Sequence, residues 1–145
     1  MSLAMTQEER EAFLADLHVG VISIEQKGQA PLAVPIWYDY NPGAGVWIIT
    51  GDASRKAKHL LAAGRFSLVA QSEEPPAYRY VSVEGPVVET RAADLERDLR
   101  PMARRYLGND MGDAYADATG VAGQSVFVMA PEKWRTVDYR KSAAS

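Results

Sequence analysis

Hydrophobic positions near the start of the chain recur first at helical and then at extended spacing. Thr6 and Glu9 form a pattern typical of a capping box, and hydrophobic residues follow them at helical intervals (Phe13, Leu14 and Leu17). This pattern predicts a short amphipathic helix. Residues 19–24 and 31–38 are rich in β-branched and aromatic residues and flank a turn, so we predict a β-hairpin. The second strand contains two prolines, which favours an edge strand or a bulge.

The rest of the chain continues as short segments of both kinds. Ser54 is expected to cap a helix over residues 55–63 that ends at Gly64. Residues 89–107 are expected to be helical, with the helix divided or restarted at Pro101, and residues 108–123 to hold one short helix. Strands are predicted over 46–50, 66–70, 78–88 with a bulge at Gly85 and Pro86, and, as a bent strand or a strand pair, 125–129 and 133–139.

Close spacing of the predicted strands indicates the fold class. About six short strands joined by hairpin turns favour an antiparallel barrel over repeated βαβ units. We therefore predict a mainly β (α+β) protein, a Greek-key barrel with short peripheral helices. The length of 145 residues indicates a single domain over residues 1–145. We expect the natural chain to start at Met5, with residues 1–4 added by the expression vector.

Composition and charge exclude several classes of function. The 16 basic and 19 acidic side chains give a net charge of −3, so no overall positive field favours nucleic acid or an anionic membrane. The chain has no cysteine and two histidines, which excludes thiolate chemistry and a histidine-rich metal site. Apolar runs are too short to span a membrane, so we expect a cytoplasmic protein without metal, nucleic-acid partner or membrane anchor.

The helix predicted after Ser54 carries the wrong charge at its start. A helix N-terminus is partially positive and favours acidic residues, yet three cations occupy this one: Arg55, Lys56 and Lys58. A bound phosphate would resolve the conflict, because Thr50, Ser54 and the free N–H groups would add hydrogen bonds. The alternative is a solvated basic helix face with Asp52 as its counter-ion, and spacing does not decide between the two.

Aromatic residues lie on the strands beside this helix start. They are Trp37, Tyr38, Tyr40 and Trp47. Together they offer enough surface to lie along a planar ligand. For any one of them, ordinary core and hairpin packing is the favoured interpretation, because strands select aromatic side chains.

These residues resemble a known family. The run GVWIITGDASRKA over residues 45–57, followed by Leu60 and by GRFSL at 64–68, is similar to the pyridoxamine 5′-phosphate oxidase-like flavin-binding split barrels. The similarity extends over about residues 18–85, with a weaker match over 126–139. The resemblance implies a homodimer of Greek-key split barrels that binds FMN at the subunit interface and acts on a small molecule.

The resemblance also implies roles for individual residues. Ile49 and Thr50 would line the cofactor, and Arg55 and Lys56 would hold its phosphate beside Ser54. The strand segment Val34, Pro35, Ile36 and Trp37 would pass under the flavin ring. Tyr80 stands where the family usually has a glutamine near the flavin, and Trp134 would reach the flavin of the other subunit.

Departures from the family pattern limit the activity. The true oxidases hold pyridoxal phosphate with basic residues where this chain has Leu32 and Trp37, and with a C-terminal motif where it has residues 135–138. We therefore expect an FMN-dependent oxidoreductase acting on a small conjugated or aromatic molecule, with unknown catalytic side chains. His18 and His59 are expected to be structural.

Two alternatives remain open. One is a deazaflavin (8-hydroxy-5-deazaflavin) reductase of the related actinobacterial branch, which shares the pair Trp37 and Tyr38 and the strand at 80–85. The other is an FMN-binding module without turnover.

Overall fold

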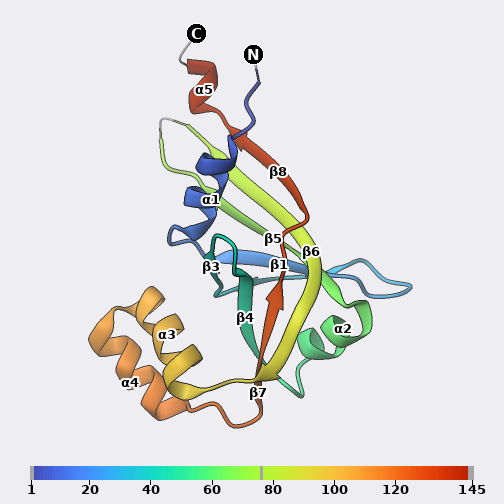
Figure 1. The fold of residues 1–145 in the computed structure, drawn as a ribbon, viewed down its shortest axis with the longest axis vertical. Coiled ribbons are helices and arrows are strands. Elements are labelled where there is room, and N and C mark those ends of the chain that lie inside the picture. Colours follow the sequence, from blue (N-terminus) through green and yellow to red (C-terminus); the bar gives the residue numbers. More distant parts are fainter. Residues whose placement is uncertain (1, 76, 144–145) are drawn as a thin grey trace.

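The computed structural model describes residues 2–75 and 77–143 and shows a curled antiparallel sheet with helices around it (Figure 1). Eight strands form the sheet in the order β2-β1-β5-β6-β7-β4-β3, and β8 pairs with β6 outside this path. The strands are β1 (Gly20–Ile24), β2 (Leu32–Ile36), β3 (Asp39–Asn41), β4 (Gly45–Gly51), β5 (Arg65–Ser72), β6 (Arg79–Ala92), β7 (Gln124–Met129) and β8 (Lys133–Asp138).

The helices are short and lie outside the sheet. They are α1 (Gln7–Ala15), α2 (Arg55–Ala63), the π-helix η1 (Leu95–Leu99), α3 (Arg100–Leu107), α4 (Asn109–Thr119) and α5 (Arg140–Ala143). No helix of the described residues is long and apolar enough to cross a membrane. The predicted fold class, a split barrel with short peripheral helices, is confirmed.

Alternating burial shows how the sheet forms its core. In β4, the side chains of Val46, Ile48 and Thr50 are buried, whereas Trp47 and Ile49 point to the other face and are half-buried. Strands with this alternation pack one face on a core and leave the other free for helices or ligands. Both α1 and α2 add buried side chains to the same hydrophobic cluster, and they lie near opposite ends of the curled sheet (Figure 1).

The local helix signals in the sequence are confirmed. Thr6 and Glu9 form the predicted capping box of α1. Ser54 caps α2 by accepting a hydrogen bond from the N–H of Ala57, and α2 ends at Gly64, whose φ of 69° is the left-handed conformation that favours glycine. Strand β2, which contains Pro35 and follows Pro31, is an edge strand, also as predicted.

Strand β6 differs from the prediction. Residues 89–92, expected to be helical, extend β6 to 14 residues because they pair with β7. The irregularity lies between Val87 and Glu89 rather than at Gly85 and Pro86. Gly85 is needed for close approach instead, since a Cβ there would lie 1.8 Å from the carbonyl oxygen of Ala130.

The last part of the chain contains more elements than predicted. The C-terminal strand pair consists of β7 and β8, which each pair with β6 rather than with one another. With the unexpected β3, this raises the strand count from about six to eight. Between β6 and β7, residues 93–123 contain the helices η1, α3 and α4, which lie beside the sheet (Figure 1). Pro101 lies in the first turn of α3, as predicted.

Candidate functional site

A cavity of about 310 Å³ lies between the sheet and the inserted helices. One wall comes from β2 and β4, one edge from the first turn of α2, and the opposite wall from α3, α4 and the loop that follows α4. Its volume falls at the lower end of the range for small-molecule sites.

Six of the sequence-predicted site residues line this cavity: Pro35, Ile36, Trp37, Ile49, Thr50 and Lys56. They meet because β2 ends beside the carboxyl-terminal half of β4, which leads directly into α2. Lys56 is the one charged side chain of this cavity lining within residues 2–75 and 77–143. The cavity therefore has a single cationic end.

Arg55 and Lys56 are neighbours in sequence but point to different places. Lys56 lines the cavity, whereas the Arg55 guanidinium donates a hydrogen bond of 2.9 Å to the buried side-chain oxygen of Gln26. The structure thus brings one of the two predicted phosphate ligands to the cavity and ties the other to the loop after β1.

The start of α2 offers further anion-binding groups at the cavity edge. The hydroxyl groups of Thr50 and Ser54 lie 3.1 Å apart, and the first turn of α2 contains no acidic residue. The N–H groups of a first helical turn have no carbonyl partner within the helix. Asp52, the alternative counter-ion, accepts a hydrogen bond from the Ser125 hydroxyl, and across the described chain it forms no ion pair with the three basic residues.

Four further predicted site residues are not part of the cavity lining. Val34 packs against the hydrophobic core, and Ser54 caps α2 at the cavity edge. Tyr80 lies on β6, with its ring 5.9 Å from the ring of Tyr78. Trp134, on β8, lines a separate hollow of about 390 Å³ and stacks beneath the Arg10 guanidinium at 4.5 Å. Whether a second subunit brings Trp134 to a cofactor stays a prediction.

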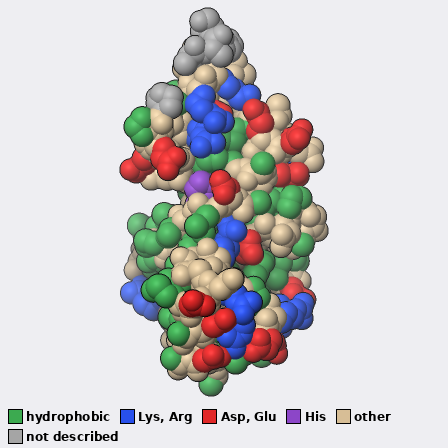
Figure 2. Space-filling model, turned by 90° about the vertical axis from the view of Figure 1, so that its left-hand side faces the viewer, with side chains coloured by type: hydrophobic (Ala, Val, Ile, Leu, Met, Phe, Trp, Pro, Cys, Tyr) green, Lys and Arg blue, Asp and Glu red, His purple; other side chains and the backbone are tan. Residues whose placement is uncertain are grey.

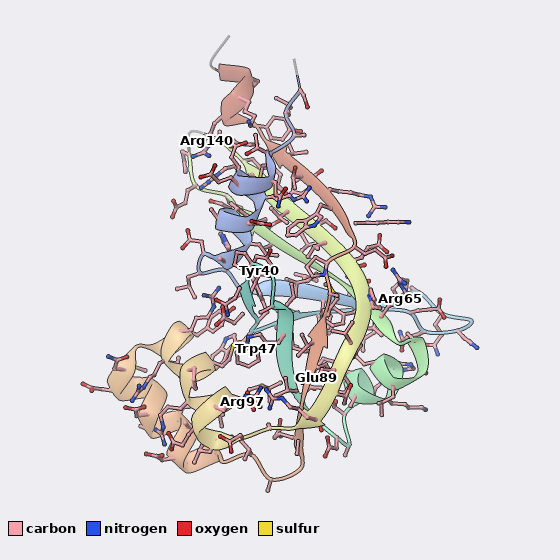
Figure 3. The ribbon with its side chains drawn as sticks, in the orientation of Figure 1. Tyr40, Trp47, Arg65, Glu89, Arg97 and Arg140 are labelled. Carbon is pink, nitrogen blue, oxygen red and sulfur yellow. The ribbon has the colours of Figure 1, made fainter. Side chains whose placement is uncertain are left out.

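The four strand aromatics do not form one surface. Tyr38 and Tyr40 are core residues, and burial raises the pKa of the Tyr38 hydroxyl, which donates a hydrogen bond of 2.7 Å to the carbonyl of Leu14. Trp47 lines another hollow together with Glu89 and Arg97 (Figure 3). Core packing therefore explains Tyr38 and Tyr40, and Trp37 is the member of this set that lines the cavity.

The helical wall of the cavity was not foreseen from the sequence. Its members include Leu99, Met102, Tyr115 and Val121, and Gln124 joins them from the start of β7. They belong to a segment that meets β2 and β4 through tertiary contacts. No local sequence pattern therefore identifies them as cavity residues. The one usable signal was the clustering of helix-forming and small residues after the fifth predicted strand.

Ion pairs hold this helical wall together and fix it to β6. The Arg91 guanidinium donates two hydrogen bonds, of 2.6 and 2.8 Å, to the buried carboxylate of Asp98 in η1. Between α3 and α4, Arg100 and Arg104 both bond to Asp113. Figure 2 shows acidic and basic side chains mixed on the outer surface of this region. Ion pairs therefore connect the helices of this wall on its outer surface. The side chains that it contributes to the cavity are uncharged.

The histidines lie outside this cavity. A ring nitrogen of His18 lies 3.0 Å from the carbonyl oxygen of Phe13, and the two rings stack with centroids 4.4 Å apart. Burial lowers the pKa of His18, which disfavours its charged form. These contacts give His18 the structural role expected for it, at the end of α1.

Comparison with known proteins agrees with this architecture. The sequence profile of the family described as Pyridoxamine 5′-phosphate oxidase matches residues 6–138. The chain belongs to this family. The resemblance seen in residues 45–57 therefore extends over nearly the whole chain, including the helical insert. In sequence alone, no curated protein matches the chain significantly.

Solved structures of the same fold carry different names. The conserved hypothetical protein Rv2991 from Mycobacterium tuberculosis has 23% identity and a TM-score of 0.80, covering 97% of this chain and 89% of its own. A protein named F420 reductase has 16% identity and a TM-score of 0.70, with coverage of 86% and 94%. A FAD-binding protein from Mesorhizobium loti has 18% identity and a TM-score of 0.68, with coverage of 93% and 94%. At these identities the likeness establishes the fold alone.

Proposed function

We propose that the protein binds FMN in the cavity between β4, α2 and the inserted helices, and that it is an oxidoreductase for small conjugated or aromatic molecules. The observation that carries the proposal is the polarity of the cavity. One end has Lys56, Thr50 and the start of α2, whereas the other is formed by Trp37, Tyr115 and aliphatic side chains. An anionic tail and an uncharged ring match these two ends.

The residues present fit an FMN molecule in that orientation. Lys56 and the first-turn N–H groups of α2 would hold the phosphate, with Thr50 beside them. Ile49 and the backbone of residues 35–37 would lie along the flavin ring, which leaves the indole of Trp37 to the substrate. When bound, the flavin supplies hydride transfer, while the protein supplies binding, orientation and exclusion of water.

A deazaflavin of the 8-hydroxy-5-deazaflavin type is the second candidate cofactor. The fold shared with the protein named F420 reductase favours it. Against it stands the charge of the site, because a tail with a phosphodiester and further carboxylates needs more than one lysine. We therefore place FMN first.

A homodimer with the cofactor between subunits completes the proposal. Apolar side chains remain exposed beside the cavity on α4, where Met111 is 66% and Tyr115 41% exposed. Such residues on a protein of this size are consistent with a covering partner. An FMN-binding module without turnover would share this assembly and differ only in its lack of reaction with reductants.

Cofactor identity and the role of Lys56 are tested together. Native mass spectrometry of the protein from its own host gives the cofactor mass and the subunit number. Titration of FMN into cofactor-free protein then compares Lys56→Ala with Lys58→Ala and Arg55→Ala, which remove the same charge from neighbouring positions outside the cavity lining. One charge-assisted phosphate contact of roughly 1.5–3 kcal/mol corresponds to a loss of about tenfold to a hundredfold for Lys56→Ala.

The controls decide the interpretation. We expect Lys58→Ala and Arg55→Ala to change the FMN affinity by less than about threefold, since general electrostatic attraction at an exposed site is weak. Equal losses in all three variants would refute the cavity as the phosphate site. Absorbance bleaching under anaerobic NAD(P)H or a reduced deazaflavin supports the enzyme, whereas a bound flavin that no donor reduces supports the module.

A further inference from the structure

The indole of Trp37, on the cavity wall, is held by a residue outside the cavity. Its ring stacks on the ring of Tyr106 with centroids 4.9 Å apart and planes 4° from parallel. Tyr106 belongs to α3 and is not part of the cavity lining. Because Tyr106 covers one face of the indole, Trp37 presents its remaining surface to the cavity.

The hydroxyl of Tyr106 fixes the position of this stack. It lies 2.6 Å from the carbonyl oxygen of His18 and 3.0 Å from that of Tyr38, and it accepts a hydrogen bond of 3.1 Å from the N–H of Tyr38. These partners belong to the chain before β1 and to the residue directly after Trp37. The Tyr106 hydroxyl therefore connects α3 to the backbone at Tyr38, next to the residue that carries the indole.

Neighbouring side chains restrict the indole further. The guanidinium of Arg105 donates hydrogen bonds to the carbonyls of Tyr38, Ala15 and Asp16, which ties α3 to the end of α1. The ring of Tyr115 also contacts the indole, with centroids 5.7 Å apart and planes tilted by 57°. Trp37 thus has little freedom to rotate, unlike a single exposed tryptophan.

We propose that Trp37 is the platform for the planar ring of the substrate and that Tyr106 is a positioning residue that sets the plane of this platform. A fixed aromatic wall favours flat, uncharged ligands over globular ligands of equal size, because only the flat ones gain offset stacking over their whole surface. The uncharged lining around it, Leu99, Met102 and Tyr115, gives no compensation to a charged ring. This inference rests on the proposed function and narrows its substrate class.

The test measures shape selection without any redox step. Two uncharged, redox-inert probes with the same number of carbon atoms are titrated calorimetrically into the protein as purified: 2-naphthamide, which is flat, and 1-adamantanecarboxamide, which is globular. The readout is the ratio of their affinities. A purely structural defect lowers both affinities and leaves the ratio unchanged.

Three variants address the stack. Tyr106→Leu removes the ring and should reduce the planar-to-globular ratio about tenfold. Tyr106→Phe keeps the ring and should hold the ratio within about threefold of the wild type. Trp37→Leu removes the platform but keeps the hydrogen bonds of the Tyr106 hydroxyl, and it should reduce the ratio by the same factor of about ten. This variant therefore tests the proposal even if Tyr106→Leu does not fold. Tyr78→Leu, whose ring pairs with Tyr80 outside the cavity, is the matched control.

Wild-type protein that binds both probes equally, or neither, would overturn the proposal, as would unchanged ratios in Tyr106→Leu and Trp37→Leu. Failure of the proposed function has a different signature, namely protein that retains no flavin or deazaflavin and reacts with no donor. The affinity ratio remains measurable in that case, since neither probe needs a cofactor to react with.

Discussion

Replacing Asp98 by alanine should loosen the helical wall of the cavity and destabilise the protein. The Asp98 side chain is 3% exposed and accepts three hydrogen bonds, two from the Arg91 guanidinium and one of 2.8 Å from the N–H of Asp94. These bonds join η1 to the end of β6. Leu99, the next residue, and Met102 form part of the cavity wall, so their position depends on this junction.

The loss of unfolding free energy in Asp98→Ala can be estimated from the burial of the ion pair between Arg91 and Asp98. Removing one partner of a buried ion pair costs roughly 3–5 kcal/mol, because the remaining charge is left without its counter-ion. The Arg91 side chain is 24% exposed, so water reaches it and the lower end applies. We expect a loss of about 3 kcal/mol and, for a domain of this size, a decrease in Tm of roughly 6–12 °C.

The pH dependence of this loss identifies the ion pair as its cause. Burial on its own raises the pKa of Asp98, but the hydrogen bonds from Arg91 and from the Asp94 backbone outweigh it, so the pKa lies below the ordinary 3.8. A depressed carboxyl pKa stabilises the fold above the ordinary value, and this contribution is lost as the pH falls through the folded-state pKa. The difference between wild type and Asp98→Ala should therefore be constant above about pH 5 and shrink below pH 4.

Asp113→Ala is the matched control, measured by urea unfolding at the same pH values. Asp113 also accepts bonds from two arginines, which lower its pKa to about 2, yet its side chain is 35% exposed and solvent screens the pairs. We expect a clearly smaller effect than for Asp98→Ala. A control that destabilises the protein equally, or an Asp98→Ala effect that is the same at pH 7 and pH 3.5, would refute this reasoning.

Three further outcomes are expected. Gly112→Ala should separate α3 from α4, because a Cβ at this position would lie 2.6 Å from the backbone nitrogen of Arg104; thermal unfolding measures the loss. Pyridoxamine 5′-phosphate should not be oxidised at micromolar concentrations in a steady-state assay, since the proposed function uses Lys56 for the cofactor phosphate and both Arg79 and Arg135 lie outside the cavity lining. Light scattering at micromolar concentration should give a homodimer, and a monomer there would count against a shared cofactor site.

Local signals made the two ends of α2 predictable to the residue. Ser54 and Gly64 act within a single turn each, and no distant contact is needed to place them. The same locality explains the error over residues 89–92. Their glutamate, arginine and alanine side chains favour helices, but pairing with β7 outweighs an intrinsic preference of a few tenths of a kcal/mol per residue.

Sequence reasoning named residues of the candidate site on β2 and β4 but none on the insert. Residues 35–37 and 49–50 line the same cavity although four strands separate β2 from β4 in the sheet, and their role at a cofactor stays a prediction. Which of Arg55 and Lys56 faces the cavity depends on Gln26, a residue far away in sequence that holds Arg55 elsewhere. Tyr106 and Tyr115 had no recognisable signal, since their positions depend on how α3 and α4 pack against each other and against the sheet.

The insert between β6 and β7 begins and ends at neighbouring points. Ala92 pairs with Ser125, and the N–H of Ala93 donates a hydrogen bond of 3.0 Å to the carbonyl of Gln124. The two strands would therefore accept almost any connection, from a tight turn to a small bundle, without a change in the barrel. Exchange of this insert would change the helical wall of the cavity and leave the lining from β2, β4 and α2 in place. The same junction offers a natural position for grafting helical hairpins from other members of the family.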